Sequence, residues 1–357
     1  MEAAVYAHGV EVAARLQAAV RGPTGAAVEA EEGAGPLVRL LLLASDLGDP
    51  RTAHLLLMPL AHGLSPRLGR AVLWVALMAE WLNLVLKWLL FGERPYWWVL
   101  QSGLNSTGIL QLEQFPNTCE TGPGSPSGHV MVSAAAWVVL ASWTSARLRS
   151  ITNKWVAWAL SYGTLLALLS AVGVSRIYIL AHFPHQVLGG TLAGLFLGQV
   201  LGRYLPKTQR LLPYVAWSLS LLGIAFAMFY GMQFLGFNMN WSVQLAERWC
   251  MRREWVRLDT TPLASLMRDS GACLGLGLAA WPGAVPAPGS CRSRLACAAA
   301  SLGILHAAEW VRLPGASPAI FYLLCFAKST LVPIIAMLAV PLAVRFASGS
   351  GKALKRN

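Results

Sequence analysis

Charged side chains are scarce in this 357-residue sequence: they make up 12% of it, whereas hydrophobic residues make up 56% and the mean hydropathy is +0.53. A soluble domain has about twice that share of charge, so the composition excludes one and predicts an integral membrane protein. Acidic residues are the scarcest, 16 against 28 Lys and Arg. The basic residues lie between apolar segments and recur in alternate loops, a pattern of membrane orientation rather than of nucleic-acid binding.

Cysteine is also rare, and the six cysteines have no paired spacing of the kind that zinc sites use. Most lie in or beside apolar runs, so we interpret them as core residues. The first 35 residues lack a basic flank leading into an apolar stretch, so we expect no cleavable signal peptide. The cysteines are Cys119, Cys250, Cys273, Cys291, Cys297 and Cys325.

Long apolar runs dominate the rest of the chain. A transmembrane helix needs about 20 mostly apolar residues, and nine runs predict an all-α, polytopic membrane bundle of about nine helices. We expect one membrane domain over 37–345, preceded by a flexible lumenal segment, 1–36, and followed by a basic cytosolic tail, 346–357. The predicted spans are 37–62, 69–92, 127–146, 155–174, 180–201, 211–235, 263–282, 295–311 and 318–344. The first run carries several charges, so either it does not span or it lines a polar site.

Loop charge predicts the orientation of the bundle. Lys and Arg gather in every second connection and in the C-terminal tail, which the positive-inside rule places in the cytosol. An odd number of spans then puts the N-terminus on the lumenal side. Asn105-Ser-Thr107 is a glycosylation sequon in a connection on that side, and a glycan there would mark it as lumenal.

The second apolar run has one polar stripe. Glu80, Asn83, Lys87 and Arg94 project within about 60° of one another on a helical wheel. Lys87 and Arg94 are two turns apart and reach the same region near the membrane surface, which favours an anion site. The alternative is that both simply extend to the interface, as basic residues at helix ends often do.

Two further segments carry histidines at the ends of predicted helices. A Gly/Pro-rich loop leads to Ser127-Gly128-His129, where Ser127 is a predicted N-cap. Backbone N–H groups at such a helix start favour phosphate, and His129 could protonate a departing alkoxide. Another connection supplies Arg176 and His182. In the nine-span topology, all these residues meet one face of the membrane.

Together these motifs resemble a known superfamily. Lys87-x6-Arg94-Pro95, then Pro126-Ser-Gly-His129, then Ser175-Arg176-x5-His182 are similar to the three-part signature of the type 2 phosphatidic acid phosphatases and vanadium haloperoxidases. The surrounding residues, such as 94–99 and 181–187, resemble the glucose-6-phosphatase catalytic subunits over nearly all of 46–345. Within that family, Leu47-Gly-Asp-Pro50 and Arg268-Asp-Ser-Gly271 are more similar to the third, broadly expressed form than to the liver form.

The resemblance implies a function in glucose metabolism: hydrolysis of glucose 6-phosphate in the endoplasmic reticulum membrane, with the active site facing the lumen. His182 would be the nucleophile and His129 the general acid and base. Lys87, Arg94 and Arg176 would hold the phosphate, with backbone donors near Ser127 and Gly128. No cofactor or metal is expected, although His182 and His185 could mimic a metal pair. Functional coupling to a glucose-6-phosphate transporter is expected as well.

One departure from the superfamily concerns the nucleophile. An aspartate usually follows it by four residues, whereas this chain has Gln186, a glutamine that the resemblance implies for glucose-6-phosphatases too. Another group must orient His182, and Asp49 in the polar first run is the candidate.

Two other functions fit the same residues. A lipid phosphate phosphatase would use the same catalytic groups in a pocket open to the bilayer. A sugar-phosphate transporter would bind its substrate through the same cations without cleaving it.

Overall fold

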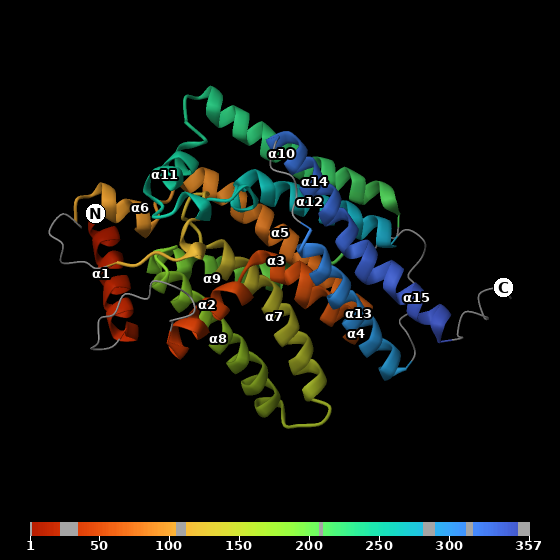
Figure 1. Cartoon of the computed structure of the whole chain (residues 1–357). Helices are drawn as coiled ribbons and strands as arrows, with labels where there is room; N and C mark the ends of the chain where they lie inside the picture. The colour runs from red at the N-terminus through yellow and green to blue at the C-terminus, as the bar shows by residue number, and fades with distance from the viewer. Residues whose placement is uncertain are drawn as a thin grey trace.

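The computed structural model describes residues 2–21, 35–104, 112–206, 210–280, 290–311 and 317–348, and these form helices joined by short loops (Figure 1). The α-helices are α1 (Glu2–Arg21), α2 (Pro36–Leu47), α3 (Pro50–Thr52), α4 (Met58–Leu64), α5 (Pro66–Leu90), α6 (Pro95–Gln101), α7 (Gly128–Leu148), α8 (Lys154–Tyr178), α9 (Pro184–Leu201), α10 (Leu211–Phe234), α11 (Trp241–Trp249), α12 (Pro262–Ala280), α13 (Cys291–Glu309), α14 (Pro318–Ile334) and α15 (Val340–Ala347). The all-α prediction is confirmed over the described residues.

Five helical segments of the described chain are long and apolar enough to cross a membrane, and the expected nine spans are not confirmed. The five are Pro66–Gln101, Gly128–Leu148, Lys154–Tyr178, Leu211–Phe234 and Pro318–Ala347. The other four predicted spans coincide with helices that are interrupted, short or less apolar. The run 37–62 is divided among α2, α3 and α4, because Gly48 and Pro50 end one helix and begin the next. The protein is nevertheless a multi-pass membrane protein.

Helix α5 lies at the centre of the bundle, where it packs against α4, α7 and α12. Helix α7 also packs against α8 and α9, and α12 packs against α10 and α14 (Figure 1). Fully buried apolar residues such as Val72, Leu73 and Val130 fill the centre. The helix ends that carry the predicted site are therefore fixed by one continuous packed core.

Glycines bring two of these helix pairs unusually close. A Cβ at Gly194 of α9 would lie 2.2 Å from the Met131 carbonyl oxygen of α7, and one at Gly275 of α12 would lie 2.1 Å from that of Thr330 in α14. Lipid provides no hydrophobic drive between helices, so close backbone contact of this kind is what holds them together. Neither position accepts a side chain.

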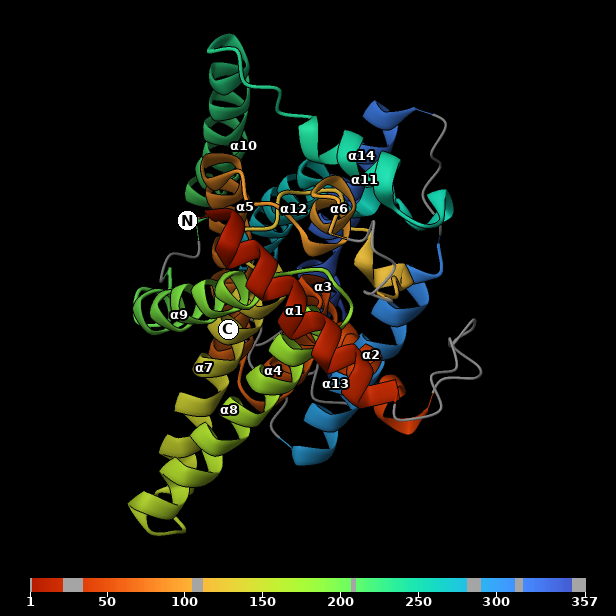
Figure 2. The same ribbon diagram turned by 90° about the vertical axis from the view of Figure 1, so that its left-hand side faces the viewer.

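The N-terminal segment corrects an expectation. Residues 2–21 of the supposedly flexible segment 1–36 form helix α1, which lies across α8 and beside α6 (Figure 2). Its buried Gln17 donates Nε2 hydrogen bonds to the carbonyl oxygens of Tyr178 (2.7 Å) and Glu113 (3.0 Å). The sequence did not reveal this helix because side-chain bonds to distant carbonyls, rather than a long apolar stretch, anchor it.

The interpretation of the cysteines as core residues is wrong for Cys291, which is exposed, and it missed that the buried Cys119 and Cys250 are paired. Cys119 and Cys250 form a disulfide with a Cα–Cα distance of 5.7 Å. They are 131 residues apart in the sequence, so local spacing carried no signal of the pairing. The bond ties the loop before α7 to the end of α11.

Candidate active site

The five predicted side chains of the site come from five separate helix ends. Lys87 is in the last turn of α5, Arg94 is the N-cap of α6, His129 is in the first turn of α7, Arg176 is in the last turn of α8 and His182 precedes α9. Hydrogen bonds and ion pairs connect four of them, and Lys87 lines the same cavity as His129. The prediction that these helix ends meet on one face is consistent with this arrangement.

The backbone holds the Arg94 guanidinium in a fixed direction. Nε donates to the Gly122 carbonyl oxygen (2.7 Å), Nη1 to that of Ala181 (3.1 Å) and Nη2 to that of Pro123 (3.3 Å). The side chain is fully buried. A guanidinium held by three carbonyls presents its remaining N–H groups in one geometry, as recognition of an oxyanion requires.

Glu120 is the residue of the site that sequence reasoning missed. Its Oε2 lies 2.9 Å from Nη1 of Arg94 and 3.9 Å from Nε2 of His182, while its Oε1 pairs with Arg176 and lies 3.4 Å from Nδ1 of His129. One carboxylate thus contacts both arginines and both histidines. The only available signal was a lone carboxylate in the loop that leads to His129.

The charge state of Glu120 follows from these contacts. Burial alone would raise the pKa of its carboxyl group, but Arg176 and Arg94 outweigh burial and hold that pKa well below its ordinary value. The two guanidinium groups therefore enclose a carboxylate anion. Its negative charge and its pair of oxygens resemble part of a phosphate group.

His182 is oriented by the main chain and by Gln186. Its Nδ1 lies 2.8 Å from the Gly124 carbonyl oxygen and 3.3 Å from Oε1 of Gln186. Gln186 is itself fixed, since its Nε2 donates to the Glu93 carbonyl oxygen at 2.7 Å. Two acceptors beside Nδ1 favour the tautomer with the proton there, which leaves the Nε2 lone pair facing Nη1 of Arg94, 3.5 Å away.

Asp49 is not the group that orients His182. It is the N-cap of α3, and its carboxylate accepts hydrogen bonds from Arg51 through Nη2 (2.7 Å), Nε (3.0 Å) and the backbone N–H (2.8 Å). These bonds, and the cationic partner in particular, hold its pKa below the ordinary value against the effect of burial. Asp49 instead lines the cavity in front of His129.

The predicted backbone donors at the start of α7 are only partly available. Ser127 is the N-cap as predicted, but its N–H already donates to the Gln186 carbonyl oxygen (3.1 Å). Its buried Oγ has no partner. Gly128 lines the cavity, and a Cβ there would lie 3.7 Å from Nζ of Lys87, so the ammonium group lies close to this glycine. Asn105 lies outside the described residues.

One group of residues in the described chain has the geometry of a metal site. Ligand atoms of His54, Glu80 and Asp269, all buried, lie within 4.8 Å of one another. They come from three separate helical segments, so sequence spacing could not reveal them, and Arg268 pairs with Glu80 beside them. His185 does not join His182 as a metal pair, because it is exposed and stacks on Phe183.

The comparisons with known proteins agree with this geometry. A family model described as the PAP2 superfamily matches residues 68–210. The chain is 42% identical over 315 residues to glucose-6-phosphatase 3 of Bos taurus, with 85% of this chain and 89% of the relative covered. The chain belongs to the glucose-6-phosphatase family.

Two further forms of glucose-6-phosphatase are less similar to this chain than form 3. Catalytic subunit 1 of Rattus norvegicus is 39% identical over 325 residues, covering 84% of this chain and 87% of the relative. Glucose-6-phosphatase 2 of Mus musculus is 34% identical over 317 residues, covering 84% and 88%. The higher identity to the form numbered 3 confirms what the motifs predict. No solved structure matches the chain.

Proposed function

We propose that this chain hydrolyses glucose 6-phosphate, or a closely related sugar phosphate, through a phosphohistidine formed on His182. One observation supports this above the others: two buried arginines and two imidazoles surround a single anion, the Glu120 carboxylate. The names of the relatives supply the sugar phosphate.

In the first chemical step, Nε2 of His182 attacks phosphorus and the bond from phosphorus to the sugar oxygen breaks. His129 donates a proton to that oxygen as it leaves. In the second step, His129 takes a proton from water, whose oxygen attacks phosphorus and breaks the P–N bond. The products are the sugar and inorganic phosphate, and His182 returns to its starting state.

The cations stabilise the charge that the phosphoryl oxygens carry in both transition states. Arg94 and Arg176 are fixed before substrate arrives, and Lys87 lines the same cavity as His129. Preorganised charge of this kind is usually the largest single contribution to catalysis. No step in this scheme needs a metal ion.

Glu120 then holds the phosphate position in the resting enzyme. A phosphate dianion and the Glu120 carboxylate cannot share the same two guanidinium groups, so substrate displaces the side chain. Until then the carboxylate neutralises two buried cations, whose burial without a partner would cost several kcal/mol.

The disulfide supports a site that faces the lumen of the endoplasmic reticulum. Cys119 is next to Glu120 in the sequence, and disulfides persist in oxidising compartments but not in the cytosol. We place the N-terminus on the same side and the C-terminus in the cytosol, from the loop charges. We also propose coupling to a glucose-6-phosphate transporter, which would bring the substrate across the membrane to a lumenal site.

Phosphate release by the purified protein in detergent tests this function. Glucose 6-phosphate should be hydrolysed and phosphatidic acid should not, whereas the reverse preference would identify a lipid phosphatase. A transporter would release no phosphate from either. His182→Ala, purified in parallel, controls for contaminating phosphatases.

A further inference from the structure

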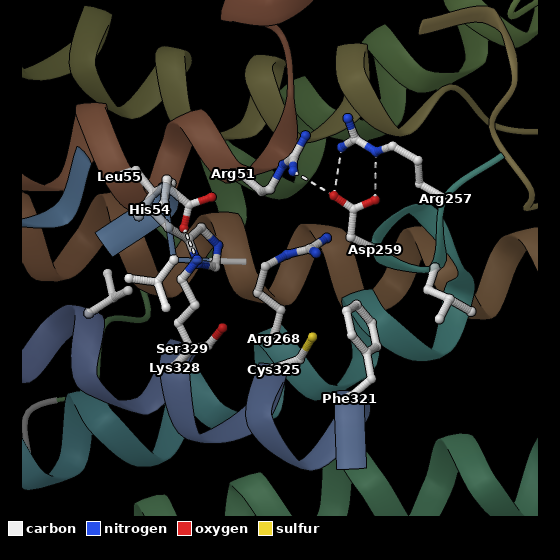
Figure 3. A pocket seen from close by; sticks show the side chains of 14 residues that line it. Arg51, His54, Leu55, Arg257, Asp259, Arg268, Phe321, Cys325, Lys328 and Ser329 are labelled. Carbon is white, nitrogen blue, oxygen red and sulfur yellow. Dashed lines mark hydrogen bonds and ion pairs between the residues drawn. The ribbon is translucent and has the colours of Figure 1, made fainter. Parts of the chain in front are cut away.

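A second cavity adjoins the phosphate pocket. The pocket with His129 and Glu120 has a volume of about 140 Å³, and its neighbour has about 640 Å³. Four side chains line both of them: Arg51, Arg257, Asp259 and Arg268. Figure 3 shows the larger cavity, with Asp259 between the guanidinium groups of Arg51 and Arg257.

The volumes of the two cavities indicate that each cavity holds a different part of the substrate. Pockets that bind small organic molecules usually measure about 300–1,000 Å³. The smaller cavity is below that range, so a phosphate group in the place of the Glu120 carboxylate leaves little room for a hexose. The larger cavity is within the range and shares four lining side chains with the smaller one.

The charges of the larger cavity favour a neutral ligand. Asp259 accepts hydrogen bonds from Arg257 through Nε (2.9 Å) and Nη2 (2.6 Å) and from Arg51 through Nη1 (3.1 Å). Lys328 pairs with a carboxylate from α13, 2.7 Å away, and Arg268 pairs with Glu80. Each of these cations already has a carboxylate partner, so the cavity is poorly suited to a second phosphate.

One buried polar atom in its wall has no partner. Nε of Arg268 is a donor that makes no hydrogen bond, whereas Nε2 of the neighbouring His54 faces Oε2 of Glu80 at 3.9 Å. Buried polar groups are nearly always satisfied, so the free Arg268 donor indicates a missing acceptor. Phe321, beside Cys325, adds an apolar surface (Figure 3). Donors, acceptors and an aromatic face together match a polyhydroxyl ring, which has hydroxyl edges and C–H faces.

We infer that the larger cavity is a sugar site: it holds the hexose of the bound substrate and the free hexose product. This inference rests on the proposed function, which it deepens by assigning the sugar to residues outside the phosphate pocket. The ion pairs of Asp259 with Arg51 and Arg257 form the boundary between the two parts of the substrate.

A native thiol reports on this cavity. Cys325 lines it, and its Sγ points inward (Figure 3). Cys273 and Cys297 are buried, so Cys291→Ser removes the other accessible free thiol. In this background we would measure the rate at which N-ethylmaleimide alkylates Cys325, by mass spectrometry of the full-length protein in detergent. Glucose at ten times its dissociation constant leaves roughly a tenth of sites open and should slow alkylation about tenfold.

Sucrose at the same concentration controls for viscosity and should not slow the reaction. Equal alkylation rates with and without saturating glucose would overturn the sugar site. This measurement needs no catalysis. If the protein hydrolyses neither substrate while glucose still protects Cys325, the proposed hydrolysis fails and the sugar site stands.

A bulky modification provides a second test. Benzyl methanethiosulfonate on Cys325 should raise the KM for glucose 6-phosphate about tenfold, as loss of ground-state binding does. Hydrolysis of acetyl phosphate, which has no sugar, should keep its kcat/KM. The same reagent should leave the kinetics of Cys325→Ser unchanged. An equal loss for both substrates would place the effect in the phosphate pocket and contradict the inference.

Discussion

Nδ1 of His182 lies 2.8 Å from the carbonyl oxygen of Gly124, so a main-chain group occupies the place where many histidine-dependent sites have a carboxylate. A neutral carbonyl orients the imidazole but stabilises the imidazolium less than an anion would. Because Gln186 completes this arrangement from the other side, the nucleophile depends on two neutral acceptors.

Gln186 should therefore act as a positioning residue. Gln186→Leu removes one acceptor from His182 and the bond to the Glu93 carbonyl oxygen, and loss of such an outer partner costs about 10- to 100-fold in activity. We expect the loss in kcat, with little change in KM. Gln186→Glu should recover part of kcat, since it restores the acceptor. A loss confined to KM would argue against an orienting role.

His182 should carry the phosphoryl group. Rapid quenching after mixing with substrate labelled in its phosphate should trap labelled wild-type protein, and His182→Ala should trap none while still inserting in the membrane. His185→Ala is the matched control, because His185 is exposed and stacked on Phe183 away from Glu120. Labelled His182→Ala protein would assign the nucleophile to another residue.

Catalysis should be independent of bound metal. The proposed steps need no metal, and none of them uses the buried group of His54, Glu80 and Asp269. Exhaustive dialysis against a chelator should thus leave kcat/KM unchanged, as measured by phosphate release. Activity that disappears and returns with zinc or magnesium would contradict the mechanism.

Much of the site could be predicted from the sequence, because its cations and histidines stand at helix ends within short motifs. Arg94 precedes a proline, and His129 follows an N-cap serine, so local patterns place both. Glu120 could not be recognised, since its role depends on contacts with four residues from other segments. Asp49 is a different case: the sequence predicts that it orients His182, but Arg51, only two residues away, binds its carboxylate instead.

The fold could be predicted less fully. Apolar runs identified the positions of the long helices. They did not distinguish helices that are long and apolar enough to cross a membrane from shorter or more polar helices such as α9 and α12. Helix α1 and the disulfide depend on long-range contacts that no periodicity records.

The disulfide should stabilise the folded protein and the position of Glu120. Cys250→Ser opens a loop of 131 residues and should lower the free energy of unfolding by about 2–4 kcal/mol. Dithiothreitol should lower the melting temperature of the wild type toward that of the variant and leave the variant unchanged. If the reductant shifts both equally, the bond does not form in the native protein.

Glu120 should compete with every anion that enters the phosphate pocket. Glu120→Gln keeps the shape of the side chain but removes its charge, so a larger fraction of the protein is open to an anion, and the apparent affinity rises with that fraction. We expect the inhibition constant for vanadate to fall about tenfold.

The Glu120→Gln variant should also melt at a lower temperature, since Arg94 and Arg176 lose their shared partner. Vanadate should raise the melting temperature of the variant more than that of the wild type. Glu254→Gln, which removes one charge from an exposed side chain that pairs with Arg252, controls for the overall charge. An unchanged vanadate affinity in Glu120→Gln would show that the carboxylate does not occupy the phosphate position in solution.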